Sequence, residues 1–138
     1  MSEAGAAPRP GLTLVVQDGR FERVHYALVL ASAAAAIGRP ALLFFTGRAL
    51  AALAPKGWRR LDGDPEGQEA RLAERRVATF AELLEACRDL DVRIVACEMG
   101  LRAEAMAPDD LDPALGVEIA GAVTMLEATP AGAQMVMV

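Results

Sequence analysis

Short apolar runs alternate with longer helical patterns along the whole chain. Strands are expected where an apolar run ends at a turn signal or a polar residue, at residues 12–19, 40–47, 92–99, 115–121 and 133–138. Helices are expected at residues 21–38, 80–90 and 122–129, with a shorter one at 48–53 and a helical turn at 108–111. The first helix should stop at Gly38, because glycine and a following proline commonly end helices.

The alternation of strands and helices predicts the fold class. Short, largely apolar strands with intervening helices are typical of a parallel sheet that is buried on both faces. We therefore expect an α/β protein, a flavodoxin-like three-layer sandwich with a mostly parallel five-stranded sheet.

Two segments depart from this pattern. Residues 55–76 carry a dense mixture of both charge signs, and we expect a solvated insertion that is helical near its end. Residues 1–11 are expected to form a short disordered lead, which leaves residues 12–138 as a single domain.

Composition narrows the class of partner. The chain has 138 residues, of which 54% are hydrophobic, enough for the core of one domain. Its net charge of −5 and few aromatic residues disfavour nucleic acid as a partner. The longest apolar stretch, residues 27–38, is shorter than the roughly 20 residues of a membrane span, and the start of the chain lacks the pattern of a secretory signal. We expect a cytoplasmic protein with no membrane span.

The two cysteines, Cys87 and Cys97, are the main candidates for chemistry. With His25 as the one histidine, they are too few for a structural zinc site. Cys87 falls on the apolar stripe of its helix and is expected to pack in the core. Because that helix runs back antiparallel to the following strand, the two thiols should lie too far apart for a disulfide, and both should be free.

Cys97 should lie at the carboxyl end of its strand, the edge where open α/β sheets bind ligands. Free backbone amides and a following turn at Gly100 would favour a thiolate there, whereas the adjacent Glu98 would oppose it. Thr46 and Gly47 end a neighbouring strand at the same edge and could line a pocket, with the alternative that Gly47 merely ends the strand. The alternative for Cys97 is a small buried hydrophobe, and position alone leaves both interpretations open.

Arg102 follows Cys97 with four residues between them. Tyrosine-phosphatase loops are one residue longer, and although rhodanese-type loops have this length, the chain beyond Arg102 does not continue as such a domain. Arg102 remains a candidate for orienting an anionic sulfur species, against the alternative of a solvated loop residue.

Three stretches, residues 27–47, 80–100 and 115–138, together resemble the DsrE/DsrF/DsrH-like (TusD-like) sulfur-relay family. They match, in order, an alanine-rich helix before a Phe-Phe strand, a helix and strand ending in a Cys-x-Met-Ser-like turn, and a final strand, helix and strand. Gly100 departs from this pattern, because many relatives have serine there.

The resemblance implies a function. Active members of the family carry sulfane sulfur as a persulfide on a cysteine, which Cys97 matches, and they assemble into homo- or hetero-oligomers. We therefore expect a cytosolic sulfurtransferase or sulfur carrier that exchanges sulfur with donor and acceptor proteins and needs no cofactor and no metal. The alternatives are a non-catalytic oligomeric subunit or ligand-binding module, in which Cys97 only packs, and a thiol redox protein.

Overall fold

The computed structural model describes residues 9–138 and contains one five-stranded sheet. Its strand order is β4-β3-β2-β1-β5, and every neighbouring pair is parallel. The strands are β1 (Leu12–Val16), β2 (Ala41–Phe45), β3 (Arg93–Cys97), β4 (Glu118–Ala120) and β5 (Gln134–Met137). The predicted α/β class is confirmed, and the sheet is parallel throughout.

The central strands are apolar on both sides because both faces of the sheet are covered. In β1, Leu14 belongs to the larger core cluster, whereas its neighbour Val15 belongs to a second, smaller cluster. The same alternation holds in β2 for Leu43 and Phe44. Period-2 alternation therefore sends successive apolar residues into two separate cores.

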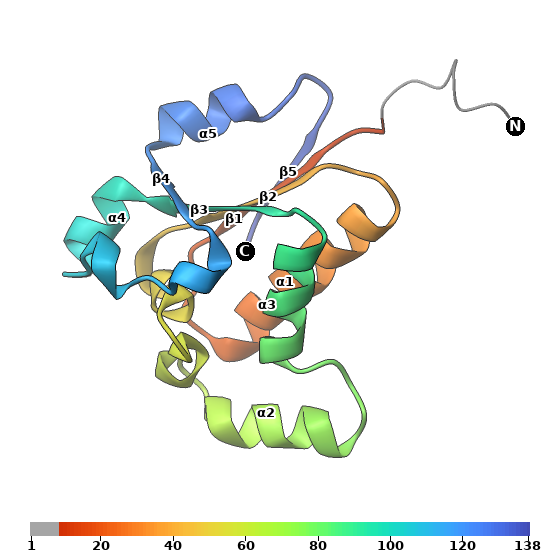
Figure 1. Ribbon diagram of the computed structural model, residues 1–138, viewed down its shortest axis with the longest axis vertical. Helices are drawn as coiled ribbons and strands as arrows, with labels where there is room; N and C mark the ends of the chain where they lie inside the picture. Colours follow the sequence, from red (N-terminus) through yellow and green to blue (C-terminus); the bar gives the residue numbers. More distant parts are fainter. Residues whose placement is uncertain (1–8) are drawn as a thin grey trace, which may run out of the picture.

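The connections between strands explain why these cores differ in size. The chain steps from β1 to β2, β3 and β4 in one direction and then returns across the sheet to β5. Since parallel crossovers are almost always right-handed, the reversed connection places its helix on the opposite face. Figure 1 shows helices α1 (Phe21–Ala36) and α3 (Phe80–Asp89) on one side of the sheet, which we call the α1 face, and α5 (Ala122–Ala128) alone on the other, the α5 face.

The helices on the α1 face begin and end at residues that suit those positions. Thr79 and Glu82 form a reciprocal capping box at the start of α3. Helix α1 is followed by Gly38 in the left-handed region, at a φ of 81°, as the stop signal in the sequence predicts. Between β3 and β4 the chain forms α4 (Glu98–Ala103) and two 3₁₀ turns, η4 (Pro108–Asp110) and η5 (Pro113–Leu115).

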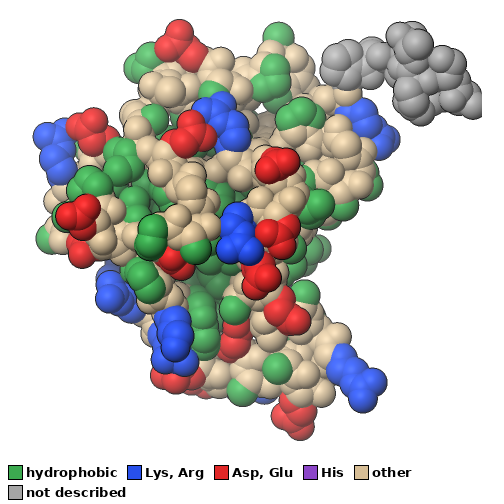
Figure 2. Space-filling view, in the orientation of Figure 1, with side chains coloured by type: hydrophobic (Ala, Val, Ile, Leu, Met, Phe, Trp, Pro, Cys, Tyr) green, Lys and Arg blue, Asp and Glu red, His purple; other side chains and the backbone are tan. Residues whose placement is uncertain are grey.

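The charged segment at residues 55–76 holds the 3₁₀ helix η3 (Gly57–Arg60) and helix α2 (Pro65–Glu74). No residue of α2 is buried, and Figure 2 shows side chains of both charge signs over this lower part of the molecule. The segment nevertheless contributes Leu61 to the core, and the ring of Trp58 packs edge-on against Phe21 with 6.3 Å between ring centroids. Its amino-terminal part is thus more buried than its charge density suggests.

The predicted lead at residues 1–11 falls mostly outside the described residues. Of its described part, Arg9 donates a hydrogen bond to the Ile37 carbonyl at 2.6 Å, and the Gly11 carbonyl accepts one from the Gln134 amide at 3.0 Å. Among residues 9–138, no helix is long and apolar enough to cross a membrane.

Candidate functional site

Cys97 is both the last residue of β3 and the residue that caps the amino end of α4. Its Sγ accepts a hydrogen bond from the Gly100 amide at 3.4 Å. The expected strand at residues 92–99 therefore ends two residues early, because Glu98 and Met99 already belong to α4. The predicted position of the thiol at the carboxyl edge of the sheet is correct, one strand in from the edge formed by β4.

The Cys97 side chain lies on the α5 face and is only 5% exposed. It belongs to a buried cluster that we call the α5-face cluster, which consists of Val15, Leu42, Phe44, Val95, Cys97 and Met125. Ala120 of β4 is paired with Cys97 in the sheet and packs at the margin of this cluster. The thiol is therefore surrounded by carbon atoms on one side and by the first turn of α4 on the other.

Thr46 and Gly100 meet beside the thiol. A Cβ atom at Gly100 would lie 2.8 Å from Thr46 Oγ1, 3.0 Å from Leu50 Cδ1 and 3.3 Å from the Cβ of Cys97. The 3₁₀ helix η2 (Gly47–Leu53), which contains Leu50, follows directly after Thr46. Glycine at position 100 thus allows α4 to pack closely against the end of β2.

Gly47 lies at the turn that follows β2. Its φ of 55° starts η2, and a Cβ there would lie 3.3 Å from the Cγ and carbonyl oxygen of Gln17. This glycine permits a tight turn next to β1, on the side of Thr46 away from β3.

Glu98 and Arg102 turn toward each other on the surface of α4. Their charged ends are 3.4 Å apart at i,i+4 spacing, and both side chains are mostly exposed. The two residues are close to Cys97 in sequence, but their charges are paired with each other in solvent.

Cys87 lies on the opposite face of the sheet, within the larger core cluster. Its Sγ is 3.7 Å from the Leu28 carbonyl, and burial raises the pKa of this thiol from its ordinary value near 9 to about 12. Both cysteines are free, as the sequence predicts. Cys87 is therefore a packed thiol that stays protonated at neutral pH.

Met125 is the member of the α5-face cluster that the sequence did not reveal. It is the one buried residue of α5, whereas Val123 and Leu126 of the same helix are exposed. A helix of seven residues has too few positions for its apolar periodicity to show which side faces the sheet.

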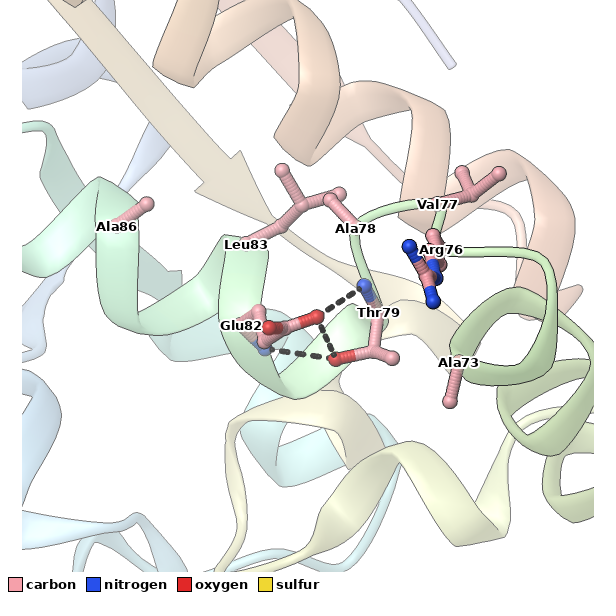
Figure 3. Close-up of a pocket in the computed structure, with 8 residues that line it drawn as sticks. All are labelled: Ala73, Arg76, Val77, Ala78, Thr79, Glu82, Leu83 and Ala86. Atoms are coloured by element: carbon pink, nitrogen blue, oxygen red, sulfur yellow. Dashed lines mark hydrogen bonds between the residues drawn. The ribbon is translucent and has the colours of Figure 1, made fainter.

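Four hollows in the described part of the chain are lined by residues other than Cys97. A groove of about 650 Å³ lies between α2 and α3 (Figure 3). Of its polar side chains, Thr79 and Glu82 are hydrogen-bonded to each other, and Arg76 lines the groove beside them. Three further cavities of about 60, 180 and 330 Å³ are also lined by other residues. Within residues 9–138, no group of three His, Cys, Asp or Glu side chains is placed to hold a metal ion.

A parallel α/β protein with a thiol at the carboxyl edge of its sheet is the class that this geometry defines. The chain belongs to the DsrE/DsrF-like family, whose sequence model matches residues 12–137. No curated protein sequence matches it significantly.

Two solved structures share the fold. The first is a protein of unknown function from Methanobacterium thermoautotrophicum, MTH1491, with a TM-score of 0.60 and 16% identity over 94% of this chain and 100% of that one. The second is the ychN protein from E. coli, with a TM-score of 0.59 and 16% identity over 93% of this chain and 99% of that one. At this identity the likeness establishes a shared α/β fold and nothing about activity.

Proposed function

We propose that this protein is a sulfur carrier that holds sulfane sulfur as a persulfide on Cys97. The observation that carries the proposal is the position of the Cys97 sulfur, at the carboxyl end of β3 and within hydrogen-bond distance of the Gly100 amide. An amide N–H that points at sulfur stabilises the thiolate, which is the nucleophilic form of cysteine. Membership of a family related to sulfur relay supports the same function.

The transfer consists of two balanced exchanges. The Cys97 thiolate attacks the outer sulfur of a donor persulfide, so that a new S–S bond forms while the S–S bond of the donor breaks. The donor leaves as a thiolate with the bonding electron pair, and the outer sulfur keeps its proton or releases it to water. An acceptor thiolate then attacks this outer sulfur and releases Cys97 as a thiolate. Neither exchange needs a metal, an organic cofactor or an external oxidant.

Thr46 lies beside Gly100, the residue whose amide donates to the Cys97 sulfur. Many relatives have serine where this chain has Gly100, and the Thr46 hydroxyl occupies the space into which a side chain at position 100 would extend. A hydroxyl is thus present on this side of α4, supplied by the end of β2 instead of by α4 itself. We assign Thr46 and Gly100 to the site, and we assign Glu98 and Arg102 to its solvated surface.

A non-catalytic role is the second candidate, and the burial of Cys97 favours it. A thiol that is 5% exposed within an apolar cluster can serve as a small core side chain. A redox role has less support, because a resolving thiol is needed and Cys87 lies on the other face of the sheet.

The proposed partners are a donor and an acceptor protein in the cytosol and further copies of this chain. The outer surface of α5 and the adjoining edge strand expose Val123, Leu126 and Met137, all more than half accessible. Apolar side chains at such exposure are typical of surfaces that pair with another protein.

Incubation with glutathione persulfide tests the proposal. A sulfur adduct on Cys97, detected by intact-protein mass spectrometry, would support the carrier function. No adduct on the wild-type protein would reject it in favour of the packing role.

A further inference from the structure

We propose that α5 is a lid over Cys97, which opens by hinging at Gly121 and at the turn of residues 130–132. The inference deepens the proposed function, because it says how a partner reaches the thiol. Its evidence, however, is the burial and anchoring of the segment, which stand whether or not Cys97 carries sulfur.

The need for an opening follows from the burial of Cys97. Sulfur exchange requires the attacked sulfur, the attacking sulfur and the leaving sulfur to lie nearly in line, so a second molecule must touch Sγ. The whole Cys97 residue is only 5% exposed, which leaves little of its surface for such contact. On the α5 face its buried neighbours are strand residues and Met125 of α5.

The position of α5 follows from the register of the sheet. Cys97 is paired with Ala120, the last residue of β4, and Gly121 leads directly from Ala120 into α5. The helix therefore starts beside the thiol and crosses the face toward β5 at the other edge of the sheet. No other helix covers this face (Figure 1) among the residues that the structure describes.

Few interactions hold α5 in place. Met125 is its one buried side chain, and Ala128 is half-buried at the margin of the α5-face cluster. Beyond the helix, the hydroxyls of Thr129 and Thr13 are hydrogen-bonded at 2.9 Å. Elements with so little buried apolar contact are the first to open locally in folded proteins.

The ends of the segment are suited to act as hinges. A Cβ atom at Gly121 would have no atom within 4 Å, and the same holds for Gly132, which has a φ of 84°. The space into which a side chain would extend is therefore open at both positions. Gly121 also caps α5 without a side-chain hydrogen bond, so opening breaks no cap there.

The closed lid would protect a persulfide that awaits its acceptor. Small thiols and water are excluded from the α5-face cluster in the closed state, and a docked partner gains access when α5 moves away. The opening of α5 does not depend on the sulfur exchange itself, so it can be tested without any sulfur transfer.

The test is the rate of alkylation by iodoacetamide, read separately at each cysteine. Trypsin releases Cys97 in the peptide of residues 94–102 and Cys87 in that of residues 77–88. Cys87 lies in the core of the other face, so its alkylation reports global unfolding. If α5 is a lid, Cys97 of the native protein should be alkylated at least about tenfold faster than Cys87. Its alkylation should still be much slower than that of Cys97 in the denatured protein.

Two variants decide between the lid and its alternatives. Met125→Ala removes the anchor and should speed alkylation of Cys97 by about tenfold while Cys87 stays slow. Thr13→Cys with Thr129→Cys, once oxidised to a disulfide, should slow Cys97 about tenfold relative to the reduced form. Leu115→Ala, a truncation in the core of the α1 face, is the matched control. It should not raise the alkylation rate of Cys97 relative to that of Cys87.

Three results would overturn the lid. Equal rates at Cys97 and Cys87 would mean that only global unfolding exposes the thiol. A rate at Cys97 equal to that of the denatured protein would mean that nothing covers it. An unchanged Cys97 rate in Met125→Ala would mean that α5 is not the cover. If the alkylation rates contradict the lid but a sulfur adduct forms on Cys97, the carrier function still stands. If the alkylation rates support the lid but no adduct forms, only the carrier function is rejected.

Discussion

The hydroxyl oxygen of Thr46 lies 2.8 Å from the position that a Cβ atom would take at Gly100. The end of β2 and the first turn of α4 therefore meet at a distance that only glycine at position 100 permits without movement. Since the Gly100 amide also donates to Cys97 Sγ, this contact fixes the donor that faces the sulfur.

We predict that Gly100→Ala lowers the free energy of unfolding by about 1–3 kcal/mol, although alanine is the better helix former. The added methyl group would be forced against Thr46 Oγ1 and Leu50 Cδ1. In a Thr46→Ala background the same change should cost less than half as much, because the closest atom is gone. Equal costs in the two backgrounds, measured by urea denaturation, would show that Thr46 does not impose the requirement for glycine.

Glu98 and Arg102 should contribute little to sulfur loading. Their side chains are mostly exposed and pair with each other at 3.4 Å, so we expect Glu98→Gln and Arg102→Gln to change the rate of persulfide formation at Cys97 by less than about twofold. Stopped-flow measurement with glutathione persulfide checks this. A tenfold loss in Arg102→Gln alone would restore Arg102 as an orienting charge.

Cys87 makes the stability of the protein sensitive to alkaline pH. The folded-state pKa of this thiol is raised to about 12, above its ordinary value near 9, so the unfolded chain loses the proton first. The contribution of the protonated Cys87 thiol to the free energy of unfolding is complete below pH 9. It is lost as the pH rises from 9 toward 12, by roughly 1 kcal/mol per pH unit. Cys87→Ala should therefore show a shallower fall in the free energy of unfolding over this range, and an identical fall in both proteins would contradict the assignment.

The exposed apolar surface of α5 should mediate self-association. Val123 is 72% and Leu126 56% exposed, and we expect Val123→Glu with Leu126→Glu to shift the protein toward the monomer in light-scattering chromatography. Tyr26→Glu, a change at an exposed apolar residue of α1, is the control and should leave the mass unchanged. A wild-type protein that is monomeric at tens of micromolar would exclude this surface as a self-association site.

The sequence is informative where apolar runs and turn residues agree. β1, β2 and β5 lie within the expected ranges because each apolar run is bounded by glycine, proline or a polar residue. The helix at α3 is equally clear, since Thr79 and Glu82 form the capping box that precedes its apolar stripe. The sheet edge that carries Cys97 follows directly from these elements.

Tertiary contacts decide what the sequence leaves open. Glu98 and Met99 follow directly after the apolar run of β3 in the sequence, but they are helical because Cys97 caps α4. The pairing of Glu98 with Arg102 and the close approach of Thr46 to Gly100 depend on how α4 lies against β2. Met125 is brought to the site by a crossover whose face is set by the strand order, which no local pattern encodes.

The central claim is that Cys97 carries sulfane sulfur, and intact-protein mass spectrometry after incubation with glutathione persulfide tests it most directly. We expect wild-type protein and Cys87→Ser to gain about 32 Da per sulfur, reversibly with dithiothreitol, and Cys97→Ser to gain nothing. Wild-type protein without an adduct, or an adduct that persists in Cys97→Ser and disappears in Cys87→Ser, would contradict the account.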